Sequence, residues 1–267
     1  MLVKDAIYTC NTGQIDGLSQ QLLERLLNKD YLVKVDHPLI ICQGRHNNPY
    51  LRPLAYRALV RAVESLNQKI VINSCLRTIM QQYMLREQYL AQICGITAAA
   101  IPGRSNHQSG RAIDVADWLY WRSPLIKYGW KWLGSWDRWH FDYQYEDLDL
   151  GKIQIKEWQQ LYNEHNPDNK LKVDGIWGAN TAASVADSPA AGFKQLPVFK
   201  RGDINRDVGK IQILLRDALN LTSSQFKADC AYGAETVKAV MAFQRLNSLP
   251  ITGECDRATL DKLAFYG

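Results

Sequence analysis

Two short stretches of the chain contain the residue types from which a metal-dependent hydrolase builds its centre. The stretch SNHQSGRAID supplies His107 and Asp114, and the later stretch DRWH begins at Asp137 and ends at His140. Two imidazoles and one carboxylate form the three-ligand set of a catalytic zinc, which leaves a fourth position for water, whereas structural zinc is usually closed by four protein ligands. Asp137 is then a spare carboxylate beside the open position, as a general base requires.

The remainder of the N-terminal half must supply the elements that hold these residues. Apolar residues spaced by three and four predict helices, and β-branched or alternating runs predict strands. On this basis the sequence predicts helices at 18–27, 53–66 and 78–93, and strands at 39–42, 69–74, 112–115 and 141–145. The elements do not alternate as in a βαβ protein, so we predict the α+β class, with a small antiparallel sheet and flanking helices.

Tryptophan is concentrated in the same region. Six of the eight tryptophans fall between Trp118 and Trp139. We expect most of them to form an aromatic core around the sheet, and a minority to line a substrate cleft, since clefts favour aromatic walls.

Composition excludes some classes of protein. The chain has 267 residues and a net charge of +5, and it contains no run of about 18 apolar residues, so we expect no membrane insertion. A mild positive excess favours polyanions or carboxylate-rich surfaces, but no basic run carries interleaved aromatics, so we expect no nucleic-acid partner. The first eleven residues lack the apolar core of a secretory signal.

The six cysteines are widely scattered and form no C-x-x-C pair. This pattern argues against a disulfide scaffold and against a cysteine zinc site. We expect them to be small buried hydrophobes in a protein made in a reducing compartment, with Cys230 and Cys255 as the one pair to examine for a bridge.

An internal repeat follows residue 150. The stretch DGIWGANT, from Asp174 to Thr181, recurs fifty-five residues later as DCAYGAET, from Asp229 to Thr236. Each copy follows a helix with an apolar-Gln step. The aspartate begins a turn, the glycine permits a tight bend and the threonine caps the next helix.

The two metal-site stretches resemble a known family of zinc peptidases. The pattern S-x-H-x-x-G-x-A-x-D from Ser105 to Asp114, followed by D-x-x-H, is similar to the D-alanyl-D-alanine carboxypeptidase class. This class includes VanY-type and VanX-type enzymes and the L-alanyl-D-glutamate endopeptidases of phage endolysins. The stretch SCLRT with Gln82 resembles the arginine-bearing segment of that family, although Cys75 and Leu76 replace its usual glycine and tyrosine. The resemblance implies a peptidase domain at 1–147 with its core at 36–147, and a fold like that of Hedgehog and the DD-peptidases.

The resemblance also implies a role for each site residue. Zinc would be held by His107, Asp114 and His140. Asp137 would be the general base, Arg77 would stabilise the developing oxyanion, and Ser105 and Gln82 would contact the substrate. The plain alternatives are an Asp137–Arg138 surface ion pair and a structural arginine at the start of a helix.

The C-terminal stretch is similar to the peptidoglycan-binding domain type 1 repeat, a small three-helix module. The fuller copy is expected at 204–267 and a partial copy at 151–187, with a linker at 188–203. The resemblance implies peptidoglycan as the partner and does not require an oligomer, so we expect a monomer.

Together these features predict a zinc-dependent hydrolase of the peptidoglycan stem peptide. An aspartate base in D-x-x-H-F resembles the endolysin-type L-alanyl-D-glutamate endopeptidases, and removal of a terminal D-alanine is the alternative. A non-catalytic wall-binding protein on the same scaffold is a third hypothesis. We expect action at the cell wall or periplasm by a protein made in the cytoplasm and released at lysis.

Overall fold

The computed structural model describes residues 1–44, 46–145, 148–194 and 197–266. The chain forms two compact units, Met1–Phe193 and Lys194–Gly267, and their boundary lies inside the stretch predicted to be a linker. Residues 146–147, 195–196 and 267 lie outside the described residues, and they include the predicted ends of the peptidase domain and of the second repeat and part of the linker.

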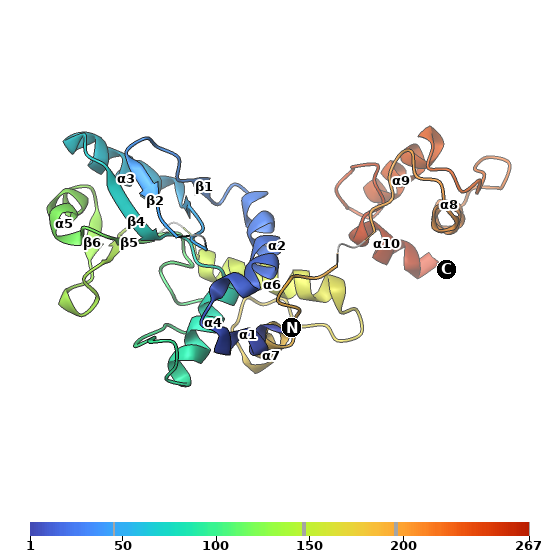
Figure 1. Cartoon of the computed structure of the whole chain (residues 1–267). Helices are drawn as coiled ribbons and strands as arrows, with labels where there is room; N and C mark the ends of the chain where they lie inside the picture. The colour runs from blue at the N-terminus through green and yellow to red at the C-terminus, as the bar shows by residue number, and fades with distance from the viewer. Residues whose placement is uncertain (45, 146–147, 195–196, 267) are drawn as a thin grey trace. The chain divides into compact units, whose positions relative to one another are not determined.

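A five-stranded sheet is formed by strands between residues 40 and 143 of unit 1 (Figure 1). Its order is β2-β4-β5-β7-β6, with β2 at Ile40–Cys42, β4 at Ile70–Ser74, β5 at Ala112–Val115, β6 at Trp130–Trp132 and β7 at His140–Tyr143. The α+β class is confirmed. The sheet is antiparallel, as predicted, except for one pair, since β2 and β4 are parallel. The helix α3 (Pro53–Leu66) lies between them in sequence and carries the chain back to the same edge.

The helices α3 and α5 (Trp118–Lys127) pack on this sheet and contact each other. Along α3, Ala55, Leu59 and Val63 are fully buried, as their spacing predicts. Burial of each large apolar side chain stabilises the fold by roughly 1.5–3 kcal/mol. Neither α5 nor β6 was predicted, since α5 contains Pro124 and β6 is only three residues long. Two residue pairs form a further small sheet, β1 (Val33–Lys34) with β3 (Tyr50–Leu51).

A second core of unit 1 is helical. It is formed by α1 (Val3–Ala6), α2 (Asp16–Leu27), α4 (Ile79–Leu90), α6 (Leu150–His165) and α7 (Ala179–Ala186), with the short 3₁₀ turns Ile7–Thr9 and Thr12–Ile15. Leu18, Leu22 and Leu26 of α2 and Trp158 of α6 are fully buried there. Arg25 joins the same two helices through Glu157, at 3.2 Å, and Glu164, at 2.9 Å.

The predicted partial repeat is therefore part of unit 1. Its two helices, α6 and α7, share the apolar core of α1, α2 and α4, and the N-terminus pairs with the segment after α7. The backbone N–H of Val3 donates to the carbonyl of Ser188, and that of Ala190 donates to Met1. The N-terminal segment covers the apolar face that this copy, which lacks a third helix, would otherwise leave exposed.

Unit 2 is a three-helix module of α8 (Arg206–Ala218), α9 (Ala234–Leu246) and α10 (Arg257–Leu263), followed by the 3₁₀ turn Ala264–Tyr266. Its core includes Leu215, Val240 and Phe243. Gln212 is buried and donates to the Asp229 carboxylate at 2.8 Å and to the Thr236 hydroxyl at 3.0 Å.

The same glutamine hydrogen bonds, to the aspartate and the threonine of the turn, recur in each copy of the repeat. In unit 1, Gln159 donates to Asp174 at 3.1 Å and to Thr181 at 3.2 Å. In unit 2, Gln244 also donates to the hydroxyl of Thr259, at 3.1 Å. The glutamine thus ties each turn to the helix before it, which gives a physical reason for the apolar-Gln step.

The expectation that the cysteines are small buried hydrophobes is wrong for Cys10 and Cys94. Cys10 and Cys94 form a disulfide that links the N-terminal segment to the end of α4. Cys230 and Cys255, the pair chosen for examination, are both free. Scatter along the sequence could not reveal that two distant segments meet. Among the described residues, no helix has the length and apolarity needed to cross a bilayer.

Candidate metal centre

Strand pairing places three of the site residues side by side. Asp114 on β5 is the register partner of both Ser74 on β4 and His140 on β7. Side chains of directly opposed residues project from the same face of a sheet. The two sequence stretches therefore meet because β5 and β7 are antiparallel neighbours.

The remaining ligand, His107, comes from a tight turn before β5. Gly110 has φ +67°, a conformation that favours glycine, and a Cβ there would lie 3.0 Å from Leu32. The turn is closed by a hydrogen bond from the Gly110 N–H to the carbonyl of His107. That carbonyl also accepts from the Arg77 N–H at 3.1 Å, so the turn is fixed to the segment after β4. This accounts for the glycine in the motif.

His107, Asp114 and His140 converge on one point. The Nε2 atom of His107 is 3.2 Å from Nδ1 of His140 and 3.3 Å from the Asp114 carboxylate, and Nδ1 of His140 is 3.1 Å from the other Asp114 oxygen. Ligands at 2.0–2.1 Å from a tetrahedral zinc lie about 3.3–3.4 Å apart. The three donor atoms already lie near that separation, and the donor set suits zinc, so the residues fit the metal.

Hydrogen bonds on the far side of each ring hold the imidazoles in this orientation. Nδ1 of His107 lies 2.7 Å from the carbonyl of Cys75, and Nε2 of His140 lies 2.8 Å from the Asp142 carboxylate. Such bonds fix the tautomer and leave the other nitrogen free to bind a metal. Asp142 thus faces away from the convergence point, as a supporting carboxylate would.

Burial and neighbouring charges shift the pKa values of the ligands in different directions. Burial lowers the pKa of His107, and the Arg77 guanidinium adds to that effect. Burial opposes protonation of His140 too, but hydrogen bonds to Asp114 and Asp142 raise its pKa to about 9. Burial by itself would raise the pKa of Asp114, yet the two imidazoles hold it well below its usual range. In neutral solution, one imidazolium therefore pairs with the carboxylates beside one neutral imidazole.

Asp137 lines the cleft that contains these ligands. It ends the 3₁₀ turn Ser135–Asp137 between β6 and β7. Burial raises its pKa above the usual value; the imidazole of His140 opposes the rise, and the Asp114 carboxylate adds to it. A carboxylate with a raised pKa is a better proton acceptor than an ordinary aspartate near neutral pH.

Arg77 lies at the junction of the two cores of unit 1, because Cys75 packs in the sheet core and Leu76 in the helical one. Thr78 begins α4 with a capping box, in which its hydroxyl accepts from the Gln81 N–H and the Gln81 side chain accepts from the Thr78 N–H. The guanidinium of Arg77 donates to Gln82 at 3.0 Å. The charges of Asp114 and Asp137 act on it, although burial lowers its pKa.

The two residues predicted to contact substrate differ in their surroundings. Ser105 is nearly buried and lines the cleft. Gln82 also lines it, but its amide donates to the carbonyl of Ala100 and its oxygen accepts from Arg77. In this structure Gln82 therefore positions Arg77 and the loop before Ser105.

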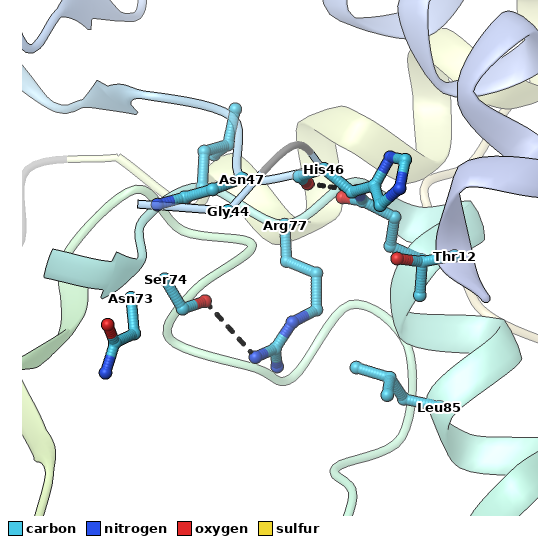
Figure 2. Close-up of a pocket in the computed structure, with 10 residues that line it drawn as sticks. Thr12, Gly44, His46, Asn47, Asn73, Ser74, Arg77 and Leu85 are labelled. Carbon is cyan, nitrogen blue, oxygen red and sulfur yellow. Dashed lines mark hydrogen bonds between the residues drawn. The ribbon is translucent and has the colours of Figure 1, made fainter. Parts of the chain in front are cut away.

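The cleft has a volume of about 510 Å³. A smaller cavity, of about 280 Å³, shares Arg77 and Leu85 with it. Figure 2 shows the Arg77 side chain extending into this second space, with a hydrogen bond to Ser74. One guanidinium thus faces two adjoining cavities.

The cleft lining also includes residues that were not predicted, and among them Arg86, Tyr89, Arg104 and Trp136 supply further cations and aromatic rings. Arg86 and Tyr89 lie on α4, and Arg104 on the loop before Ser105. Only Trp136 gave a signal in the sequence, because it directly precedes the predicted base. Two histidines outside the cleft have other contacts: His46 lies 2.7 Å from Asp16, and the His165 ring stacks on Phe193.

Comparisons with known proteins bear mainly on the C-terminal unit. No curated protein matches the chain. Among solved structures, one match is described as "Structure of the LdcB LD-carboxypeptidase reveals the molecular basis of peptidoglycan recognition". The two chains are 18% identical with a TM-score of 0.36, and the match covers 54% of this chain and 75% of the other. A likeness at that level says nothing about the activity of this chain. Residues 205–263 match the family described as "Putative peptidoglycan binding domain". The resemblance noted for the second repeat is confirmed, and the C-terminal unit contains a domain of the peptidoglycan-binding family.

Proposed function

We propose that the protein is a zinc-dependent peptidase of the peptidoglycan stem peptide. The observation that carries this proposal is the convergence of His107, Asp114 and His140 to within 3.3 Å of one another in a cleft that also contains Asp137 and Arg77. Three ligands, a base and a fixed cation are the parts that amide hydrolysis requires. The peptidoglycan-binding domain at 205–263 supports the choice of polymer.

Each protein group has a defined task in this scheme. His107, Asp114 and His140 would hold a zinc ion, which would supply Lewis-acid activation of water and of the scissile carbonyl. The Asp137 carboxylate accepts the proton of the attacking water and transfers it to the leaving amine. The Arg77 guanidinium faces the negative charge that develops on the carbonyl oxygen, and its bonds to Gln82 and Ser74 hold it in place.

The C-terminal domain would act as a tether. Binding of the polymer by one unit raises the effective concentration of stem peptides at the other, without any new contact at the cleft. We therefore place the site of action at the cell wall.

Within this class we propose cleavage of the L-alanyl-D-glutamate bond, on the resemblance of the D-x-x-H-F stretch to the endolysin-type enzymes. Removal of a terminal D-alanine is the second candidate. The observation that favours it is the presence of Arg86 and Arg104 in the cleft, because a carboxypeptidase must bind a free carboxylate.

Mass spectrometry of peptidoglycan fragments, with and without a chelator, tests both proposals. Loss of a single alanine identifies a carboxypeptidase, and release of a whole stem peptide that begins with glutamate identifies the endopeptidase. In Asp137→Ala we expect turnover to fall at least about a hundredfold with zinc still bound. Asp36→Ala, which removes an exposed carboxylate outside the cleft, is the matched control. Full activity of Asp137→Ala would remove its assignment as base, and turnover without metal would refute the proposal.

A further inference from the structure

Trp136 is the most exposed tryptophan of the chain, and it lies at the cleft of the metal ligands. Its side chain is 71% exposed, and it lines the cleft of the metal ligands one residue before Asp137. By contrast, Trp121, Trp130 and Trp158 are fully buried in the two cores of unit 1. None of the core contacts accounts for Trp136.

The loop that carries Trp136 is held at both ends. The N–H of Leu133 donates to the carbonyl of His140 at 3.1 Å, and the Trp132 indole N–H donates to the carbonyl of Arg138 at 2.9 Å. Gly134 has φ +112°, which allows the chain to turn out of β6 into this loop. The ring is therefore presented from a fixed backbone, and little entropy is lost when a ligand contacts it.

The cleft offers two chemically different surfaces. Leu133 and Trp136 supply an apolar and aromatic one from the loop between β6 and β7, whereas Arg86 and Arg104 supply cations from α4 and the loop before Ser105. A stem peptide also has two different ends. Its first alanine is attached to a sugar of the glycan, and the residues beyond that alanine carry free carboxylates.

A sugar ring suits an exposed indole. The C–H groups on one face of the ring carry partial positive charge and meet the negative face of the aromatic system, while the hydroxyls at the rim stay hydrated. Carboxylates suit guanidinium groups, with which they form charge-assisted hydrogen bonds. Matching the two ends of the peptide to the two surfaces gives the substrate a single direction in the cleft.

We propose that Trp136 is a sugar-stacking subsite, which binds the glycan sugar that carries the stem peptide. The inference rests on the proposed function and sharpens it. Only one residue separates that sugar from an L-alanyl-D-glutamate bond, and one residue spans at most about 3.6 Å. A terminal D-alanine bond lies several residues further away, so a sugar on Trp136 favours cleavage at the first bond.

The test compares one stem peptide in two forms, free and attached to its muramic acid sugar, as substrates of the full chain loaded with zinc. In Trp136→Ala we expect the ratio of kcat/KM for the sugar-linked form over the free form to fall about tenfold, through KM, which corresponds to about 1.4 kcal/mol of lost contact. Trp136→Phe should keep most of the ratio. Tyr8→Ala, an aromatic residue that is 75% exposed outside the cleft, is the control and should keep all of it.

Different outcomes separate the two proposals. An equal loss on both substrates in Trp136→Ala, or an unchanged ratio, would overturn the sugar subsite and leave the peptidase intact. If the native chain cleaves neither form, the proposed function fails. Calorimetric titration with the sugar-linked peptide then decides the subsite without turnover: weaker binding to Trp136→Ala than to the native chain supports it, and equal binding refutes it.

Discussion

Gln154 joins the helix α6 to the metal-site loops, and its removal should weaken unit 1 strongly. The side chain is fully buried, and its amide donates to the carbonyl of Gln108 at 2.8 Å and to that of Arg77 at 3.2 Å. In Gln154→Leu the volume is nearly kept, but both carbonyls lose this donor inside the protein. The change in stability therefore reports the loss of the two hydrogen bonds, with little contribution from packing.

The expected cost follows from these two contacts. A buried acceptor left without a donor costs about 1–3 kcal/mol, so with two such carbonyls we expect Gln154→Leu to lower the free energy of unfolding of unit 1 by about 2–6 kcal/mol. With a urea dependence of about 3 kcal/mol per molar, the midpoint should fall by roughly 1 M. Because one of the carbonyls belongs to Arg77, activity should also decline at urea concentrations where the native chain is still fully active.

Urea unfolding followed by tryptophan fluorescence measures the shift, since Gln154 lies near Trp158 on the same helix. Gln160→Leu makes the same chemical change on α6 at a partly exposed position, whose one contact with Arg25 is 3.5 Å long. We expect it to cost less than about 0.5 kcal/mol. A loss below 0.5 kcal/mol in Gln154→Leu, or equal losses in both variants, would refute the assignment of α6 as a support of the metal site.

Three further outcomes are expected. Zinc affinity should rise about tenfold per pH unit between pH 7 and 8.5, because His140 has a pKa of about 9 in the metal-free chain and must lose its proton to bind metal. Competition with a chelator measures the affinity at each pH, and an affinity that does not change with pH would contradict the prediction. Reduction of the Cys10–Cys94 disulfide should lower the free energy of unfolding by about 2–5 kcal/mol, whereas the Cys10→Ser chain should be insensitive to reductant. Gln212→Leu should unfold unit 2 at lower urea and leave zinc affinity unchanged, and a change in affinity would show that the units are coupled.

Much of the candidate metal site could be predicted from the sequence, because its residues are close in the chain or follow a strict pattern. The turn at Gly110 and the strand β5 follow directly from local geometry, and antiparallel pairing then brings His140 opposite Asp114. The cleft wall could not be predicted in the same way. Arg86 and Arg104 reach it from different elements, and their meeting depends on how α4 packs.

Long-range pairing also explains the other differences. The parallel pairing of β2 with β4 depends on the packing of α3, and the disulfide joins segments 84 residues apart in sequence. The repeat was visible in residue types, but residue types do not show which core the first copy packs against. Only the buried faces of α6 and α7 against α1, α2 and α4 show that it belongs to unit 1.

The placement of the first repeat constrains how such a chain can exchange parts with other proteins. Gly151 of α6 lies so close to the loop before Ser105 that a Cβ would approach the Gly103 carbonyl to 2.4 Å. A recombination joint at residue 150 would therefore separate α6 from the loop at Gly103. A helix from another protein without glycine at position 151 would not restore this close contact. A joint after Phe193 leaves unit 1 whole. A segment exchanged together with the candidate metal site must therefore include the first copy of the repeat, and only the second module can be exchanged by itself.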